Sequence, residues 1–239
     1  MSPGRLAIDL AHPYAAVVTG GDVDWGEEAE QLVRSSSLTV AADRGAEVLY
    51  RHGLVPSVLV GDFDSCDRAV VEALRARGAG VIALERDKDK TDTEEALGLV
   101  SSAGFQQAVV LGAVGGERLE HSVANLSLIE AFAARGLDVV VAHGRGVIFG
   151  LAGSRQGRMA GPASSRTIRG GKGDFVSLFP VTREARGVTT GGLRFPLSGA
   201  TLRRGSTLGT SNEMTGEEAS LSLEEGFLLV VVTRLSGRR

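Results

Sequence analysis

The sequence contains one cysteine, Cys66, and four histidines among its 239 residues. A single thiol cannot close an intramolecular disulfide, and histidines without a second cysteine offer no zinc-finger spacing. Because a chain without disulfides suits a reducing compartment, the composition favours a cytoplasmic protein.

Long apolar runs are missing as well. The longest, residues 227–232, is far too short to cross a bilayer, and residues 1–21 include no apolar run of signal-peptide length. The formal net charge of -3 gives no general attraction to nucleic acid or to anionic lipid. We therefore expect a soluble, untargeted protein that binds neither nucleic acid nor membranes.

The residues that are present can form a sizeable core, since 43% are hydrophobic and 23% are charged. Through residue 143, short apolar segments alternate with longer helical patterns such as those at residues 68–78 and 122–136. This alternation is typical of an α/β domain with a mostly parallel, Rossmann-like sheet, here spanning residues 1–143. The predicted strands are residues 15–19, 38–42, 57–61, 81–84, 108–112 and 138–142.

From residue 144 onward, glycine, serine and short alternating apolar segments predominate, with no convincing amphipathic helix. This pattern predicts a C-terminal all-β sandwich domain over residues 144–239. Its predicted strands are residues 146–151, 175–178, 193–196, 200–202, 219–223 and 226–233. Residues 154–173 have almost no apolar content, and we expect them to form a mobile loop.

Acidic side chains follow three of the predicted strands in the first domain. Asp43 follows the second strand, and Asp62 and Asp64 follow the third. Asp89 and Asp92 lie in the loop after the fourth. Open α/β sheets bind ligands beyond the carboxyl ends of their strands, where loops and helix N-termini converge. We therefore expect these five aspartates to gather at one end of the sheet.

Such a cluster needs a cation, because two carboxylates about 5 Å apart repel by roughly 3 kcal/mol at an effective dielectric constant of about 20. Mg²⁺ is held by a few carboxylates and keeps positions for water and substrate phosphates. A set without histidine or thiolate argues against zinc. The aspartates therefore predict a magnesium-dependent, phosphate-handling site.

Simpler roles remain open for individual residues. Thr91 and Glu94 have the spacing of a capping box, and Ser65 could cap a helix that begins near Asp67. An isolated aspartate after a strand is usually a turn former. The coincidence of acidic residues in three loops is what favours a metal site.

Basic residues near the acidic loops suit a polyphosphate. Lys88 and Lys90 can neutralise a triphosphate as charge moves to the leaving group, although both can also be solvated surface charges. After the fifth strand, a glycine-rich segment precedes Arg118 and His121, and an arginine fork matches phosphate geometry. His121 could equally be a helix residue satisfied by its neighbours. Neither GxxxxGK[ST] nor GxGxxG occurs at a strand-to-helix junction, which excludes a P-loop and a dinucleotide fingerprint.

Four ordered motifs resemble the thiamine pyrophosphokinase family. They are GDFDS (61–65), KDKTDTEEAL (88–97), GGERLEHSVAN (115–125) and GTSNE (209–213). The resemblance covers nearly the whole chain and implies transfer of a pyrophosphoryl group from ATP to the hydroxyethyl oxygen of thiamine, giving thiamine diphosphate and AMP. It also implies the two-domain fold described above and a homodimer, with thiamine bound where the domains and subunits meet.

The resemblance assigns roles to residues of this sequence. The residues implied to be catalytic and to hold Mg²⁺ and the ATP phosphates are Asp62, Asp64, Asp89 and Asp92. The resemblance also implies that Asp43 completes the acidic wall, that Arg118 contacts phosphate oxygens, and that Ser211 and Asn212 contact thiamine or the nucleotide. The further candidates for binding the nucleotide are Lys88, Lys90, Thr91 and His121. Ser211 and Asn212 could instead form a hydrogen-bonded turn between strands.

Three positions depart from the family pattern. Arg44 stands where the family commonly has glycine, Glu120 replaces aspartate before the histidine, and Glu117 is an extra residue before Arg118. Two other functions stay open: a pyrophosphokinase for another alcohol, such as a hydroxymethylpterin, and a non-catalytic nucleotide-sensing module. The GTSNE motif favours thiamine over a pterin, and the complete carboxylate loops favour catalysis over sensing.

Overall fold

The computed structural model describes residues 6–144, 146–153 and 163–235. The chain divides into two compact units, which we call the parallel unit and the antiparallel unit after their sheets. The parallel unit consists of Ala11–Leu128 and Val141–Gly144, and the antiparallel unit of Met1–Leu10, Ile129–Val140 and Arg145–Arg239. Among the described helices, none is long and apolar enough to cross a membrane.

The parallel unit is built on five parallel strands in the order β4-β3-β2-β1-β5. They are β1 (Ala15–Val18), β2 (Leu38–Ala42), β3 (Val58–Gly61), β4 (Gly80–Ala83) and β5 (Gln107–Leu111). Every residue of β1 and β5 is buried, as expected for strands covered on both faces, whereas the edge strand β4 is exposed. The sequence prediction of these strands is confirmed to within one residue at each end.

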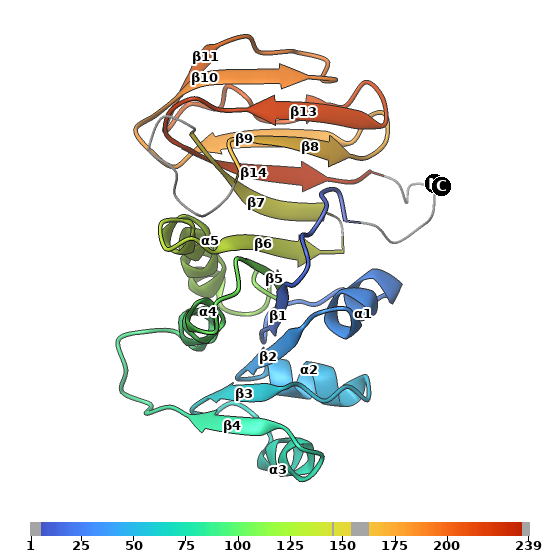
Figure 1. Ribbon diagram of the computed structural model, residues 1–239, viewed down its shortest axis with the longest axis vertical. Helices are drawn as coiled ribbons and strands as arrows, with labels where there is room; N and C mark the ends of the chain where they lie inside the picture. Colours follow the sequence, from blue (N-terminus) through green and yellow to red (C-terminus); the bar gives the residue numbers. More distant parts are fainter. Residues whose placement is uncertain (1–5, 145, 154–162, 236–239) are drawn as a thin grey trace. The chain divides into compact units, whose positions relative to one another are not determined.

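Helices cover both faces of this sheet, and Figure 1 shows α4 on the opposite side of the strands from α1 and α2. The helices are α1 (Glu27–Arg34), α2 (Gly45–Arg51), α3 (Arg68–Ala76) and α4 (Asp92–Ser102). The boundary between the units falls within α5 (Leu119–Ala133) and β6 (Asp138–His143).

The predicted cap of α3 is wrong: Asp67, not Ser65, accepts a hydrogen bond from the Ala69 backbone at 2.8 Å. Ser65 lies too far upstream, and its hydroxyl donates to Asp43 instead.

The antiparallel unit contains a four-stranded sheet, β11-β10-β13-β8, and the strands β12-β9-β14-β7, which are one end of a ten-stranded sheet. These strands are β7 (Gly146–Ala152), β8 (Ser165–Arg169), β9 (Phe175–Pro180), β10 (Glu184–Gly191), β11 (Ala200–Arg203), β12 (Asn212–Glu213), β13 (Glu218–Ser222) and β14 (Phe227–Thr233). All pairings among these strands are antiparallel. Along β9 and β13, buried and more exposed residues alternate, which is the period of a sheet with one face on a core.

Three expectations for this unit need correction. The predicted loop at 154–173 contains strand β8, while residues 154–162 lie outside the described part of the chain. As an edge strand, β8 buries only Ile168, so its sequence shows almost no apolar signal. Residues 193–196 do not form a strand, since Leu193 makes only an isolated bridge to Met214 after the turn at Gly192 (φ 71). The polar strand β10 and the two-residue β12 were not predicted.

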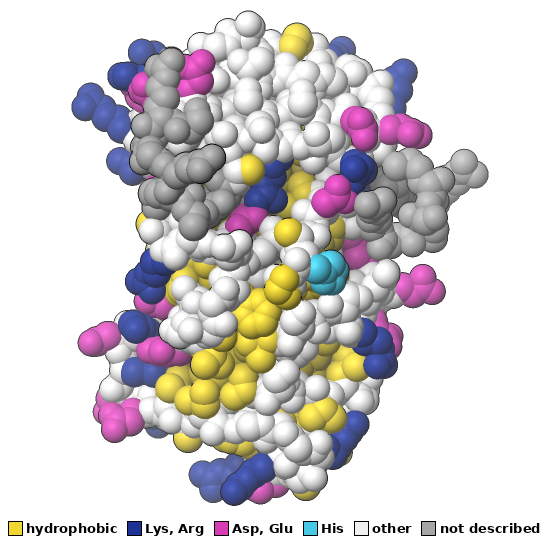
Figure 2. Space-filling model, in the orientation of Figure 1, with side chains coloured by type: hydrophobic (Ala, Val, Ile, Leu, Met, Phe, Trp, Pro, Cys, Tyr) yellow, Lys and Arg dark blue, Asp and Glu magenta, His cyan; other side chains and the backbone are white. Residues whose placement is uncertain are grey.

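Apolar side chains also reach the surface. Figure 2 shows one face of the molecule, on which patches of apolar side chains lie between charged ones. In the parallel unit the most exposed large apolar residues are Leu119 and Val123, which are 75% and 67% exposed. They lie four residues apart at the start of α5, so both belong to one uncovered strip of that helix.

Candidate active site

A cavity of about 700 Å³ lies at the carboxyl ends of the five parallel strands. The loops after all five strands line it, together with the first turns of α4 and α5. Strand β1 lies between β2 and β5, so the strand order reverses there. Open α/β sheets bind ligands at such a reversal, and the cavity occupies the place that the sequence predicted.

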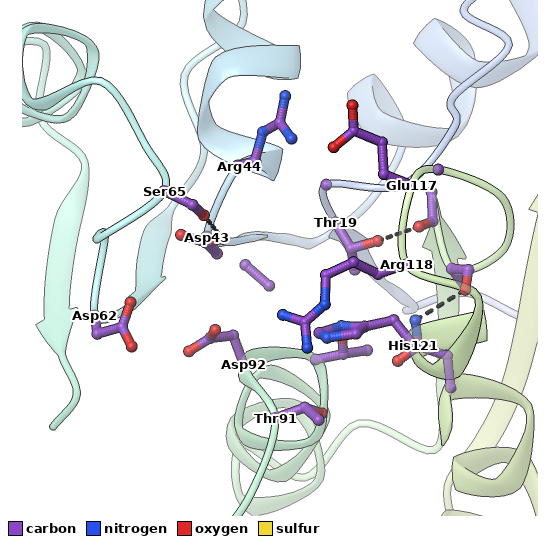
Figure 3. Close-up of a pocket in the computed structure, with 18 of the residues that line it drawn as sticks. Thr19, Asp43, Arg44, Asp62, Ser65, Thr91, Asp92, Glu117, Arg118 and His121 are labelled. Atoms are coloured by element: carbon purple, nitrogen blue, oxygen red, sulfur yellow. Dashed lines mark hydrogen bonds between the residues drawn. The ribbon is translucent and has the colours of Figure 1, made fainter. Parts of the chain in front are cut away.

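One wall of the cavity holds a partly buried charge cluster. The Lys88 ammonium lies 3.2 Å from Asp62 Oδ2 and 3.2 Å from Asp92 Oδ1. Figure 3 shows the Asp62 and Asp92 carboxylates pointing toward each other from the loop after β3 and the start of α4. The side chains of Lys88, Asp62 and Asp92 are only 17%, 15% and 23% exposed. One lysine between two carboxylates leaves this wall with an excess of negative charge.

The two carboxylates differ in their affinity for a proton. The Asp64 backbone N–H donates to Asp62 at 3.1 Å, and this bond together with Lys88 lowers the pKa of Asp62. Burial raises the pKa of Asp92, against the opposing effect of Lys88. Burial also opposes the charge of Lys88, but hydrogen bonds to Asp92 and Asp62 outweigh it and raise the lysine's pKa. Asp92 is therefore the more readily protonated of the two acids.

Asp43 adds a third acidic side chain to this wall. It stands at the end of β2 in the left-handed backbone region (φ 48), which short polar side chains tolerate. Ser65 donates a hydrogen bond to one of its carboxylate oxygens, while Asp43 Oδ1 is buried and accepts none. Asp92 Oδ1 is likewise buried, and faces only the Lys88 ammonium. Asp43 Oδ1 is thus left able to accept a cation or a hydrogen-bond donor, whereas Asp92 Oδ1 already lies beside the lysine.

The opposite wall is formed by the glycine-rich segment after β5. Gly112, Gly115 and Gly116 have φ values of 78°, 84° and 82°, which only glycine adopts without strain. Figure 3 shows the Arg118 side chain extending from this wall into the cavity. Its guanidinium pairs with Glu120 at 2.7 Å, and both side chains are largely exposed. This arrangement gives a flexible cation opposite a fixed acidic wall.

The structure brings together most of the residues predicted from the sequence. Those that line the cavity are Asp43, Asp62, Asp64, Lys88, Lys90, Thr91, Asp92, Arg118 and His121. Thr91 also caps α4, because its hydroxyl accepts from the Glu94 backbone at 3.2 Å as the capping box predicts. Asp89 does not line the cavity, although its sequence neighbours Lys88 and Lys90 both do.

Ser211 and Asn212 belong to the antiparallel unit and form the kind of hydrogen-bonded turn that the sequence left open. Asn212 is buried and clamps Phe195: its amide accepts from the Phe195 backbone N–H at 3.0 Å and donates to the Phe195 carbonyl at 2.7 Å. Ser211 is exposed with a φ of 57°, and its backbone N–H donates to Ser177 at 2.9 Å. Their predicted contacts with a ligand stay a prediction.

Several lining residues were not predicted. Gly20 and Gly21 follow β1, and a Cβ on Gly21 would lie 2.2 Å from the Gly112 carbonyl oxygen. The paired glycines directly after the first strand are a signal that could have been used. Asn125 also lines the cavity and donates to the Ala113 carbonyl at 2.8 Å, but a single asparagine within a helix gives no comparable signal.

Comparison with known proteins identifies the family. Residues 29–141 match the family model of the thiamin pyrophosphokinase catalytic domain, and residues 165–228 match that of the thiamin pyrophosphokinase vitamin B1 binding domain. The chain belongs to the thiamin pyrophosphokinase family. It is 21% identical over 215 residues to a thiamine pyrophosphokinase of Bacillus subtilis (strain 168), covering 90% of this chain and 96% of the relative.

Solved structures of the family share the fold. The crystal structure of the Bacillus subtilis thiamine pyrophosphokinase superposes with a TM-score of 0.79 at 21% identity, over 93% of this chain and 99% of the other. A thiamin pyrophosphokinase from Geobacillus thermodenitrificans gives a TM-score of 0.72 at 28% identity, over 94% and 99% of the two chains. The predicted combination of an α/β domain with a separate antiparallel β domain is confirmed.

Proposed function

We propose that this member of the family transfers a pyrophosphoryl group from ATP to thiamine, giving thiamine diphosphate and AMP. The observation that carries the proposal is the acidic cluster of Asp62, Lys88 and Asp92 at the carboxyl ends of the parallel strands. It lies within the segment that matches the catalytic family model, and the same chain also matches the vitamin B1 binding model. The match to the vitamin B1 binding model favours thiamine over a pterin as the acceptor. The match to the catalytic model favours an enzyme over a non-catalytic sensing module.

We further propose that the acidic wall holds Mg²⁺ with the ATP phosphates. The donors available are carboxylate oxygens, including the buried Oδ1 of Asp43, which accepts no hydrogen bond, and the Oδ1 of Asp92, which faces the Lys88 ammonium at 3.2 Å. Within the described residues, no three acidic, histidine or cysteine side chains converge closely enough to hold a metal by themselves. That finding suits Mg²⁺, which takes one or two carboxylates and completes its shell with water and phosphate oxygens. One or two of the cavity-lining residues Asp62, Asp64 and Asp92 would hold the ion, while the part predicted for Asp89 stays a prediction.

The hydroxyethyl oxygen of thiamine would attack the β-phosphorus of ATP and expel AMP. The protein would contribute mainly by positioning the reactants and neutralising the phosphate charge. When bound, Mg²⁺ supplies positive charge to the transferred unit. Lys88 lies at the centre of the acidic wall and Arg118 on the opposite wall, so the two can contact phosphate oxygens from both sides. Lys90 pairs with Glu95 at 3.5 Å at the edge of the cavity and would add a further cation there.

The two matched family models support a separate role for each domain. We propose that residues 1–143 form a Rossmann-like domain that binds ATP and Mg²⁺, and that residues 144–239 form a β-sandwich that binds thiamine. Ser211 and Asn212 are the proposed thiamine contacts in that second domain. Support comes from the vitamin B1 binding match at 165–228, which includes both residues.

We also propose that the enzyme is a cytoplasmic homodimer. The exposed apolar strip of Leu119 and Val123 on α5 supports a dimer, because a monomer would leave both side chains in water. The single cysteine and the absence of a membrane-spanning helix among the described residues agree with a reducing aqueous compartment.

The proposal is tested by incubating the purified protein with Mg²⁺, ATP and thiamine, and measuring AMP and thiamine diphosphate. We expect both products in equal amounts, and none when Mg²⁺ is removed with EDTA. AMP release with a hydroxymethylpterin but not with thiamine would select the pterin kinase. Nucleotide binding without turnover of either acceptor would select the sensing module.

A further inference from the structure

Arg44 differs from the other basic residues of the cavity. The Lys and Arg residues that line it are Arg44, Arg86, Lys88, Lys90 and Arg118. Each of the other four lies within 4 Å of a carboxylate, the longest separation being 3.5 Å between Lys90 and Glu95. Arg44 forms neither an ion pair nor a side-chain hydrogen bond with any residue that the structure describes. Its guanidinium therefore has no short-range partner among the described residues.

The local structure makes room for this side chain. Arg44 directly follows Asp43 and precedes α2, and its backbone is helical (φ -59°), so no strain opposes it. A Cβ on Gly20 would lie 2.8 Å from Arg44 Cβ, which means that the missing side chain of Gly20 provides the space for the arginine stem. Figure 3 shows Arg44 on the same side of the cavity as Glu117, away from Asp92 and Thr91.

We propose that Arg44 binds a phosphate oxygen of the nucleoside triphosphate and thereby adds a nucleotide-specific contact to this site. The inference rests on the proposed function and deepens it by naming a further binding residue. A guanidinium forms strong paired hydrogen bonds with phosphate, and an unpaired one need not break an existing ion pair first. Thiamine carries a positive charge of its own, so Arg44 favours the nucleotide and not the acceptor.

The test compares Arg44→Ala and Arg44→Lys with the wild-type protein. We expect Arg44→Ala to raise the KM for ATP and the Kd of a non-hydrolysable ATP analogue about tenfold, since a charge-assisted hydrogen bond contributes roughly that factor. The KM for thiamine should change less than twofold, and Arg44→Lys should recover part of the loss. An ATP-analogue affinity of Arg44→Ala within twofold of wild type would overturn the inference.

Arg51→Ala provides the matched control. Arg51 is an exposed arginine at the other end of α2, donates only to the Glu47 carbonyl within its helix, and does not line the cavity. The control removes the same charge from the same helix, so unchanged nucleotide affinity there assigns the effect of Arg44→Ala to its position. An equal loss in both variants would show that net charge alone is responsible and would overturn the inference.

A second substitution, Glu117→Gln, distinguishes direct binding of the nucleotide by Arg44 from an indirect effect of Arg44 on Glu117. If Arg44 contacts the nucleotide, Arg44→Ala should weaken nucleotide binding by the same factor in the Glu117→Gln background as in the wild type. If the loss disappears in that background, Arg44 merely neutralises Glu117 and the inference fails. Equal melting temperatures of the variants would exclude misfolding as the cause.

Measuring binding with the analogue keeps the two proposals distinguishable. Weaker analogue binding by Arg44→Ala in a protein that forms no thiamine diphosphate would support the role of Arg44 and contradict the proposed function. Formation of thiamine diphosphate by the wild type, with unchanged analogue affinity in Arg44→Ala, would contradict the role of Arg44 alone. A wild-type protein that binds no nucleotide would overturn both.

Discussion

The two units of the molecule treat buried charge differently. In the antiparallel unit, Arg166 pairs with Asp138, the two side chains are only 11% and 9% exposed, and the guanidinium also lies 5.0 Å from the centre of the Phe149 ring. That ion pair joins two charges of opposite sign. In the parallel unit, a single lysine, Lys88, lies between two carboxylates at the wall of a cavity. We call a buried ion pair of equal and opposite charges balanced, and such a pair contributes to the fold. A buried cluster with an excess of one charge is unbalanced, and next to a cavity it indicates a site that binds a ligand of the opposite charge.

The strongest test of this contrast removes one acid from the unbalanced cluster. Asp62→Asn keeps the shape of the side chain but removes a proposed ligand of Mg²⁺ and a partner of Lys88. We expect turnover to fall by about a thousandfold or more, because the charges that neutralise the transferred group are then misplaced. The fold should survive, since Asp92 still pairs with Lys88. Measuring AMP release and the melting temperature of the same preparation checks both statements.

Asp87→Asn is the matched control for this variant. Asp87 is an exposed residue of the same loop as Lys88 and does not line the cavity. We expect it to retain activity within about twofold, as surface changes away from a site usually do. Near-normal AMP release by folded Asp62→Asn would contradict the proposed role of the cluster.

A substitution in the Arg166–Asp138 pair should reduce stability and leave activity nearly unchanged. Asp138→Asn leaves the Arg166 guanidinium buried beside a neutral amide, and breaking a buried ion pair from one side costs about 3 kcal/mol or more. We therefore expect a clear fall in the urea midpoint of unfolding, with little change in the KM for ATP of the protein that remains folded. A stability loss below about 1 kcal/mol would show that the pair is not important for the fold.

The sequence allowed the parallel unit to be predicted closely, because its strands are buried on both faces and separated by helices. The same reasoning located the cavity, since Asp43, Asp62 and Asp92 directly follow strands or begin a helix, where chain direction alone fixes their place. The antiparallel unit was predicted less well. Its strand β8 buries only Ile168, so its polar sequence does not differ from that of a loop.

Within the site, contacts between loops could not be predicted. Asp89 lies only three residues before Asp92 in the sequence, yet only Asp92 begins α4 and lines the cavity. The sequence shows Arg44 only as a departure from the family pattern, because its lack of a partner depends on where the loops after five different strands meet. Sequence periodicity reports which residues face a core, and it carries no information on which charges remain unpaired around a cavity.

Cys66 offers a third and smaller comparison, a buried ionisable group with acidic residues near it. Burial is the main cause that raises the pKa of its thiol to about 12, and the nearby charges of Glu47, Asp43 and Asp67 add to it. A folded-state pKa above the unfolded value of 9.0 means that the folded protein holds its proton more tightly. The resulting stability is fully present below pH 9.0 and is lost as the pH rises toward about 12.

Comparison with Cys66→Ala isolates this effect. Between pH 8 and pH 10, the free energy of unfolding of the wild type should fall by about 1.4 kcal/mol more than that of the variant, because the unfolded chain then releases a proton that the folded protein keeps. Urea unfolding of both proteins at the two pH values measures the difference, and the other titrating groups cancel because both chains share them. Equal losses in the two proteins would mean that the thiol ionises as easily in the folded chain as in the unfolded one. In that case burial near acidic residues would not be enough to hold a group neutral, and the distinction between balanced and unbalanced burial would have to rest on Lys88 and Arg166 alone.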